Sequence, residues 1–133
     1  MRAFKRLTPA AIVAIVMALS ACSGDDDTTV RMESGQSFEP KVVTISVNEI
    51  VTFVSESRDA HTVTAYEDTL PDGASFFASG GFGSEDEARD DIAGGLLSSG
   101  DSFEVEFESP GTYQYFCIPH ESSGMTGRIV VEE

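Results

Sequence analysis

The alternating pattern between residues 102 and 108 restricts the fold more than any other feature of this chain. Phe103, Val105 and Phe107 alternate with polar or acidic residues, and a period of two is that of a β-strand with one buried face. Further short segments rich in β-branched and aromatic residues are separated by turn residues, at 30–33, 42–47, 50–55, 62–66, 112–116 and 127–131. Several short strands with such turns predict an all-β fold, an antiparallel sandwich.

Residues 67–100 interrupt this rhythm and are expected to form a long excursion from the sandwich. The segment holds seven of the 12 glycines and no long strand pattern. Within it Ser84 and Glu87 have the spacing of a capping box, in which the serine caps the helix and the glutamate reaches back to it. One short helix is therefore expected over about residues 85–92. Three aromatic side chains need burial and are expected to pin the excursion to the sandwich: Phe76, Phe77 and Phe82.

The amino terminus has the features of an export signal. Three basic residues among the first six precede an apolar stretch at 10–19, which is shorter than the about 20 residues that a membrane-spanning helix needs. Leu19-Ser20-Ala21-Cys22 follows and resembles a lipobox, the motif at which prokaryotic lipoproteins are cleaved and lipidated. The alternative is a plain secretory signal followed by an incidental cysteine.

These features divide the chain into three parts. We expect a signal peptide with its lipobox over 1–21, a lipidated Cys22 with a flexible polar tether over 22–29, and one folded domain over 30–133. The expected location is the extracytoplasmic face of the cell membrane, held by the lipid. Because one of the two cysteines would carry that lipid, no disulfide is expected.

The charge of the chain limits its partners and its environment. Removal of residues 1–21 leaves five basic residues against 23 acidic ones, a net charge of −18. A nucleic-acid partner is excluded by this sign, because phosphate binding needs positive charge. At ~1 M salt the screening length is only ~3 Å, so repulsion between the carboxylates largely disappears. The acidic, lysine-poor composition is therefore typical of adaptation to high salt; the alternative is a secreted domain whose acidity serves solubility.

Four scarce side chains form a metal-ligand pattern. His61 stands far upstream, and Cys117, His120 and Met125 follow within nine residues. Two imidazoles, a thiolate and a thioether are the donor set of the trigonal copper centre with a weak axial methionine. Each residue alone is more often a surface or core residue, but one pattern uses both histidines and the cysteine that is not expected to carry lipid. We therefore expect one copper ion per chain.

The segment from Tyr113 to Gly127 resembles the ligand loop of cupredoxins, and most of all that of plastocyanin-like proteins. It has an aromatic residue before the cysteine, a proline before the histidine, a glycine before the methionine and another glycine two residues after it. The spacing from Cys117 through His120 to Met125 is that of plastocyanins and pseudoazurins. Phe38-Glu39-Pro40 and the segment around His61 also match. With the lipobox and the acidity, the chain is most similar to halocyanins, which are membrane-anchored plastocyanin relatives.

This resemblance covers residues 30–133 and implies a cupredoxin-like Greek-key β-sandwich of about 7–8 strands. It departs from the family at Thr62 and Ile118, where plastocyanins often carry an asparagine and a hydroxyl residue, and in the 67–100 excursion. The departures at Thr62 and Ile118 concern the hydrogen bonds that tune the reduction potential of the metal.

The resemblance also implies a function. The chain is expected to be a blue copper electron carrier that cycles between Cu(I) and Cu(II), with redox proteins of a membrane electron-transport chain as partners. We expect a monomer and no enzymatic activity. Two other copper functions use similar donors: a storage or delivery protein would favour Cu(I) alone, and an enzyme of the nitrite-reductase kind needs a second copper site with further histidines. A metal-free binding sandwich is the remaining alternative.

Overall fold

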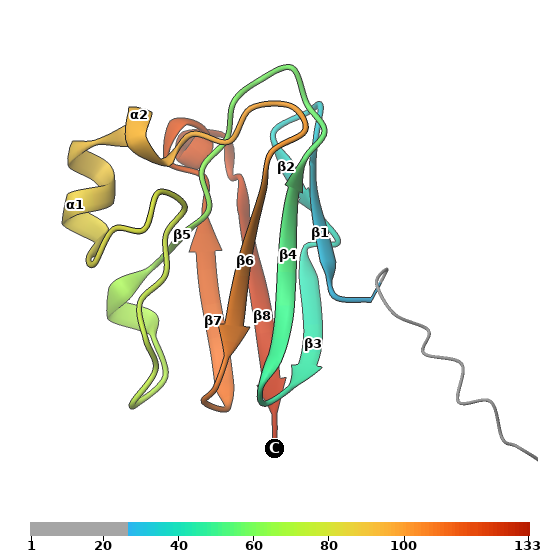
Figure 1. Cartoon of the computed structure of the whole chain (residues 1–133), viewed down its shortest axis with the longest axis vertical. Helices are drawn as coiled ribbons and strands as arrows, with labels where there is room; N and C mark the ends of the chain where they lie inside the picture. The colour runs from blue at the N-terminus through green and yellow to red at the C-terminus, as the bar shows by residue number, and fades with distance from the viewer. Residues whose placement is uncertain (1–26) are drawn as a thin grey trace, which may run out of the picture.

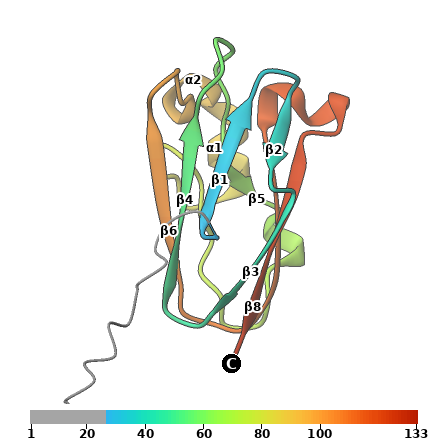
Figure 2. The ribbon, with the colours of Figure 1, turned by 90° about the vertical axis from the view of Figure 1, so that its right-hand side faces the viewer.

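The computed structural model describes residues 27–133, which form two four-stranded sheets packed face to face (Figures 1 and 2). One sheet has the strand order β2-β1-β4-β6, with β1 at Thr29–Glu33, β2 at Ser37–Glu39, β4 at Glu49–Ser55 and β6 at Ser102–Phe107. The other has the order β3-β8-β7-β5, with β3 at Val42–Ser46, β5 at Thr64–Ala65, β7 at Gly111–Phe116 and β8 at Thr126–Glu132. The predicted all-β sandwich is confirmed. The predicted signal peptide and Cys22 lie outside the described residues.

The sheets are mixed, whereas an antiparallel sandwich was expected from the sequence. β1 pairs in parallel with β4, and β3 pairs in parallel with β8; the remaining pairs are antiparallel. The parallel pairs arise because the chain changes sheet between β2 and β3 and changes back at β4. Alternation along one strand indicates which face is buried, but it contains no information on which neighbour the strand will meet.

Two strands differ from the sequence prediction. The strand expected over 62–66 is only the two residues of β5, because the segment before it turns away and His61 pairs instead with Leu97. The three-residue β2 was not predicted, since three residues are too few to show an alternating pattern.

The excursion forms two helices where one was expected. α1 spans Glu85–Asp90 and α2 spans Ile92–Gly95, and Asp91 separates them with a non-helical φ of −125° and ψ of 68°. Its carboxylate caps α2 by accepting from the Gly94 N–H at 3.0 Å. The serine half of the capping box is confirmed, since the Ser84 hydroxyl accepts from the Glu87 N–H at 3.2 Å. Glu87 reaches one residue further back than predicted, to the Gly83 N–H at 3.0 Å.

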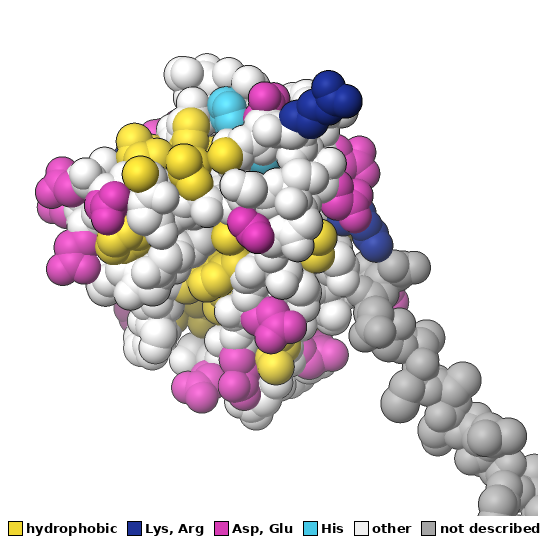
Figure 3. All heavy atoms as spheres, turned by 45° about the horizontal axis from the view of Figure 1, so that its top comes forward, with side chains coloured by type: hydrophobic (Ala, Val, Ile, Leu, Met, Phe, Trp, Pro, Cys, Tyr) yellow, Lys and Arg dark blue, Asp and Glu magenta, His cyan; other side chains and the backbone are white. Residues whose placement is uncertain are grey.

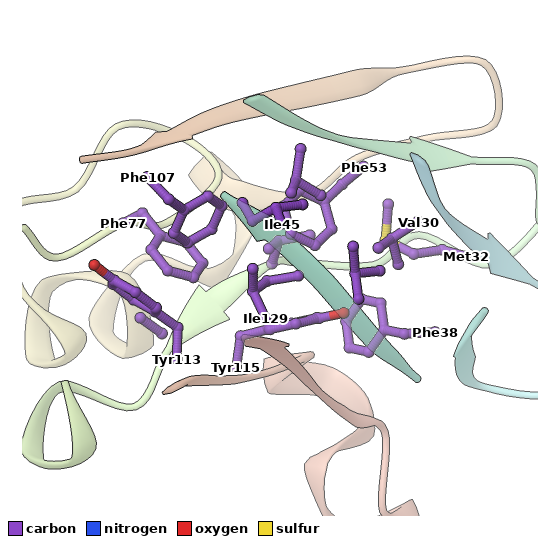
Figure 4. Packing of buried hydrophobic residues seen from close by; sticks show 14 of the residues in the cluster. Val30, Met32, Phe38, Ile45, Phe53, Phe77, Phe107, Tyr113, Tyr115 and Ile129 are labelled. Atoms are coloured by element: carbon purple, nitrogen blue, oxygen red, sulfur yellow. The ribbon is translucent and has the colours of Figure 1, made fainter. Parts of the chain in front are cut away.

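Aromatic side chains fill the space between the sheets (Figure 4). The Tyr115 ring meets Phe38 and Phe53 edge to face, with centroid distances of 4.7 and 5.2 Å. Phe77 of the excursion packs on Phe107, centroid to centroid at 5.5 Å. Complete burial of one such side chain is worth about 1.5–3 kcal/mol. The excursion is therefore pinned to the sandwich chiefly by Phe77, as expected; the other two phenylalanines named above are half-buried.

Gly127 is required by the core, which explains its place in the ligand-loop motif. It is the cross-strand partner of Tyr115, and a Cβ added at Gly127 would collide with the Tyr115 ring and hydroxyl. Because Tyr115 is fully buried, it has no room to move aside. We predict that Gly127→Ala lowers the free energy of unfolding by about 1–3 kcal/mol, the usual cost of overpacking. Urea unfolding of the copper-free protein measures it.

The control for this substitution is Gly83→Ala. Gly83 is exposed, and the nearest atom to an added Cβ is a Glu87 carboxylate oxygen at an ordinary 3.5 Å. This variant should unfold within about 0.5 kcal/mol of the wild type. Equal urea midpoints for the two variants would show that the Tyr115 ring does not require a glycine at position 127.

The predicted metal ligands lie at one end of the sandwich. Two further 3₁₀ helices complete the secondary structure: η1 at Glu67–Thr69, and η2 at Ile118–Ser123 between β7 and β8. Figures 1 and 2 show η2 and α2 at the same upper end of the sheets. Among the described residues, no helix has the length and apolar character that a membrane crossing requires.

Candidate metal centre

Residues 117–125, called here the ligand loop, connect two adjacent strands. The last pair of the β7–β8 ladder is Phe116 with Thr126. Immediately beyond it the Cys117 N–H donates to the Met125 carbonyl at 3.0 Å, and the Met125 N–H donates to the His120 carbonyl at 3.2 Å. The sheet and these backbone bonds therefore hold all three of the loop's predicted ligands.

A glycine makes the return of the loop possible. Gly124 has a φ of 80°, in the left-handed region that residues with a Cβ rarely adopt. Its N–H donates to the Glu121 carbonyl at 2.9 Å and ends η2. This turn delivers the next residue, Met125, into the interior, where its side chain is fully buried.

His61, which precedes the excursion in the sequence, lies beside the ligand loop in the fold. Its backbone pairs with Leu97 in both directions, with N to O distances of 3.1 and 2.7 Å. The side chain is fully buried. Its Nδ1 faces the other predicted ligands, while its Nε2 has no hydrogen-bond partner among the described residues. The position of His61 is therefore fixed by its backbone pairing with the excursion and by packing.

The donor atoms of three predicted ligands converge. The Nδ1 atoms of His61 and His120 are 3.2 Å apart, and they lie 3.8 and 3.3 Å from the Cys117 Sγ. A point equidistant from the three atoms lies about 2 Å from each, close to the about 2.0–2.3 Å of metal–nitrogen and metal–sulfur bonds. The donor set therefore fits a metal ion of this size. Within the described part of the chain, these three residues are the only such cluster of His, Cys, Asp or Glu.

Burial determines the protonation state of two of these donors, Cys117 and His61. Removal from water raises the pKa of the Cys117 thiol, although the Thr62 N–H and His120 lower it. Desolvation, and then the neighbouring His120, lower the pKa of His61. In the metal-free protein at neutral pH, the cysteine is thus a thiol and His61 is neutral. Metals bind the thiolate, so uptake of an ion must release the thiol proton.

Thr62 forms hydrogen bonds with Cys117 and with the residue that follows it. Its N–H donates to the Cys117 Sγ at 3.4 Å, and its hydroxyl accepts from the Ile118 N–H at 2.8 Å. Thr62 and Ile118 are the two departures from the plastocyanin pattern named above, and the Ile118 side chain has no group that forms a hydrogen bond. The structure shows that the backbone of Ile118 provides the bond instead. Such contacts orient the donor and tune its basicity.

The sequence analysis missed an ion-pair network beside the ligand loop. Arg89 of α1 binds Glu121, with its two terminal nitrogens 2.8 and 3.2 Å from the two carboxylate oxygens. Glu121 follows His120 directly and also accepts from the Tyr66 hydroxyl at 3.1 Å. Arg89 is the only lysine or arginine between Arg58 and Arg128. That isolation, with Glu85 one helical turn before it, is a signal that sequence reasoning could have used.

Comparison with known proteins agrees with this site. The model of the family "Copper binding proteins, plastocyanin/azurin family" matches residues 25–132. Plastocyanin of Scenedesmus fuscus is 37% identical over 109 residues, which are 80% of this chain and 100% of that protein. The chloroplastic plastocyanin of Chlamydomonas reinhardtii is 31% identical over 98% of this chain and 84% of that protein. A structure of a mutant plastocyanin of fern superposes with a TM-score of 0.55 at 26% identity, over 78% of this chain and 99% of that one.

The family and the donor set together define the cofactor. Copper is the metal of the matching family, and two imidazoles with a thiolate form a blue copper centre, which is a site for electron transfer rather than for turnover of a substrate. The chain is therefore a blue copper electron carrier and not an enzyme, and it belongs to the plastocyanin/azurin family of copper-binding proteins.

Proposed function

We propose that this chain carries single electrons on one copper ion, which His61, Cys117, His120 and Met125 would hold. The observation that carries this proposal is the spacing of the His61, His120 and Cys117 donor atoms, with Nδ1 to Nδ1 at 3.2 Å and the thiol sulfur 3.3 and 3.8 Å away. The bound ion would supply the Cu(II)/Cu(I) couple. The protein's part is to hold the donors in one geometry that serves both oxidation states.

The burial of the four side chains gives the electron one short route to the surface. His61, Cys117 and Met125 are fully buried, whereas His120 is partly exposed. In Figure 3, which looks more directly at this end, a histidine side chain reaches the surface beside a group of hydrophobic side chains. Ile92 of α2 and Leu96, which directly follows this helix, are each 38% exposed. We propose that redox partners dock on this apolar surface, which keeps water away from the His120 ring.

A copper storage or delivery protein is the second candidate. It would use the same donors but would bind Cu(I) selectively and release it to a recipient. The double backbone tie across the ligand loop favours a carrier, because release needs a loop that opens. Voltammetry of the copper-loaded protein separates the two functions: a carrier gives a reversible one-electron wave, and it keeps its copper through repeated cycles. Loss of copper on each reduction would support delivery.

We further propose that Cys22 carries lipid and tethers the domain to the outer face of the cytoplasmic membrane. The support is the Leu19-Ser20-Ala21-Cys22 sequence, after a basic and then an apolar segment. The polar residues between Cys22 and β1 would serve as the tether. Such a tether would keep the copper domain within reach of the membrane electron-transport proteins that we propose as partners.

The anchor predicts where the protein is found. The wild-type protein should partition into membrane and detergent fractions, and Cys22→Ser should release the domain or leave its signal uncleaved, because diacylation is the attachment. Cys117→Ser is the matched control, since it removes the other cysteine and should stay with the membrane. Mass spectrometry of the wild-type protein that finds an unmodified Cys22 at the mature amino terminus would exclude the anchor.

A further inference from the structure

A single arginine of the excursion connects α1 to the ligand loop. The Arg89 guanidinium binds both oxygens of Glu121 at 2.8 and 3.2 Å and also binds Glu85 of its own helix, through Nε at 2.9 Å and a terminal nitrogen at 2.7 Å. The three side chains are between 18% and 35% exposed. Two carboxylates that share one planar guanidinium form a far more directional contact than an ordinary surface ion pair.

The same arginine also contacts the residue that precedes Cys117. Its guanidinium carbon lies 4.5 Å from the centroid of the Phe116 ring, and the Tyr66 ring stacks on Phe116 with a centroid distance of 4.2 Å and an interplanar angle of 18°. Phe116 is fully buried. Arg89 thus gains cation–π attraction in addition to its ion pairs.

The network therefore touches the ligand loop beside two predicted donors. Phe116 comes directly before Cys117, and Glu121 comes directly after His120. Tyr66, which stacks on the first, also donates its hydroxyl to the second at 3.1 Å. A displacement of the network would consequently act on the thiol and on the exposed imidazole together.

We infer that Arg89 is a positioning residue of the copper centre, which holds the ligand loop in one geometry and thereby sets the reduction potential. This inference rests on the proposed copper site. Arg89 contacts no predicted ligand itself. It acts through Phe116 and Glu121, which it contacts and which are the sequence neighbours of Cys117 and His120. Its fork binds both carboxylates in fixed directions, which the single ammonium of a lysine cannot reproduce. The excursion, whose helix carries Arg89, is then a support for the metal site.

The plainer explanation is that Arg89 only fastens the excursion to the sandwich. Loss of that contact would lower the stability of the protein but would not alter the donors themselves. A measurement of stability alone cannot separate the two roles, so the test must report on the Cys117 thiol and on the copper couple.

The first arm of the test uses the copper-free protein. In a Cys22→Ser background, the one remaining thiol is that of Cys117, whose reaction with an aromatic disulfide reagent reports opening of the ligand loop. We expect Arg89→Gln to react about tenfold faster than the parent, because a loop held less firmly opens more often. Arg89→Lys, which keeps the charge and loses the fork, should react about threefold faster. Arg128→Gln is the charge-matched control on the exposed side of β8 and should react within twofold of the parent.

The second arm uses the copper-loaded protein. Removal of a nearby positive charge disfavours Cu(I), so at a fixed applied potential Arg89→Gln should raise the Cu(II)/Cu(I) ratio about threefold or more. Arg89→Lys should recover part of this change, and Arg128→Gln should produce less of it. Only the second arm requires copper to bind. If the wild-type protein fails to bind copper, the proposed function is overturned, but the thiol rates of the first arm still report whether Arg89 holds the loop.

One result overturns the inference. If Arg89→Gln and Arg89→Lys match Arg128→Gln in both thiol rate and Cu(II)/Cu(I) ratio, Arg89 only fastens the excursion, whatever the change in stability. If Arg89→Gln does not fold, Arg89→Lys carries the same comparison against the same control.

Discussion

Cys117→Ser should lose the blue colour completely and should bind copper more than about 100-fold more weakly, since loss of contacts around a ligand alone costs 10–100-fold. The Cys117 Sγ lies 3.3 and 3.8 Å from the two imidazole Nδ1 atoms, so it would be the third donor to a bound copper ion. A serine hydroxyl is a harder donor that does not supply the thiolate charge transfer responsible for the absorption. Copper titration with absorption and metal analysis measures both effects.

Cys22→Ser is the control for this variant, because it removes the chain's only other cysteine. It should bind copper and give the same colour as the wild-type protein. A Cys117→Ser protein that still turns blue would show that another residue provides the sulfur, and the proposed ligand set would be wrong.

Met125 substitutions should change the reduction potential by about 60 mV or more while copper stays bound, which corresponds to about 1.4 kcal/mol between the oxidation states. The two imidazoles and the thiolate determine whether copper binds, and the weak axial donor tunes how readily Cu(II) is reduced. Met125→Gln supplies a harder oxygen donor, favours Cu(II) and should lower the potential. Met125→Leu withdraws the axial donor and should raise it. Voltammetry of the three proteins tests both directions.

Met32→Leu is the matched control. Met32 is also fully buried, but it lies in β1 within the sandwich core. Its replacement should leave the potential within about 10 mV of the wild-type value, less than a fifth of the 59 mV that a tenfold change in a one-electron couple requires. Equal potentials for the wild type and both Met125 variants would exclude Met125 as a ligand.

The sequence contained most of the site because the donors are chemically rare. Only two histidines occur in the chain, and the structure brings both of them to the Cys117 sulfur. The strands could be predicted for a different reason: one buried face imposes a period of two, as the alternating burial of β3 and β8 shows. Residue chemistry and periodicity are local properties, so a single sequence reveals them.

Features that depend on contacts between distant segments could not be predicted in this way. The parallel pairing of β1 with β4 depends on the path of the chain between sheets. The shortness of β5 follows from the His61–Leu97 bridge, whose two residues are separated by most of the excursion. The helix expected over 85–92 ends early because Asp91 caps a second helix, and a capping box indicates a start but not an end.

The role of Arg89 is of the same kind. Its partner Glu121 is 32 residues away in the sequence, and on a helix so rich in acidic residues an arginine is as readily assigned to solvent. Tyr66 and Phe116 likewise meet through the fold, since Tyr66 directly precedes the excursion and Phe116 is the last residue of β7. The network follows from the docking of α1 beside the ligand loop, which the sequence pattern of neither segment specifies.

Titration of the copper-free protein with Cu(II), followed by absorption near about 600 nm, tests the central claim most directly. The three converging donors predict an intense band that grows linearly and stops at one copper per chain, because the sulfur and the two imidazoles hold one ion together. Stoichiometric copper without this band would mean that the Cys117 thiolate does not bind the metal, and it would contradict the assignment of a blue copper electron carrier.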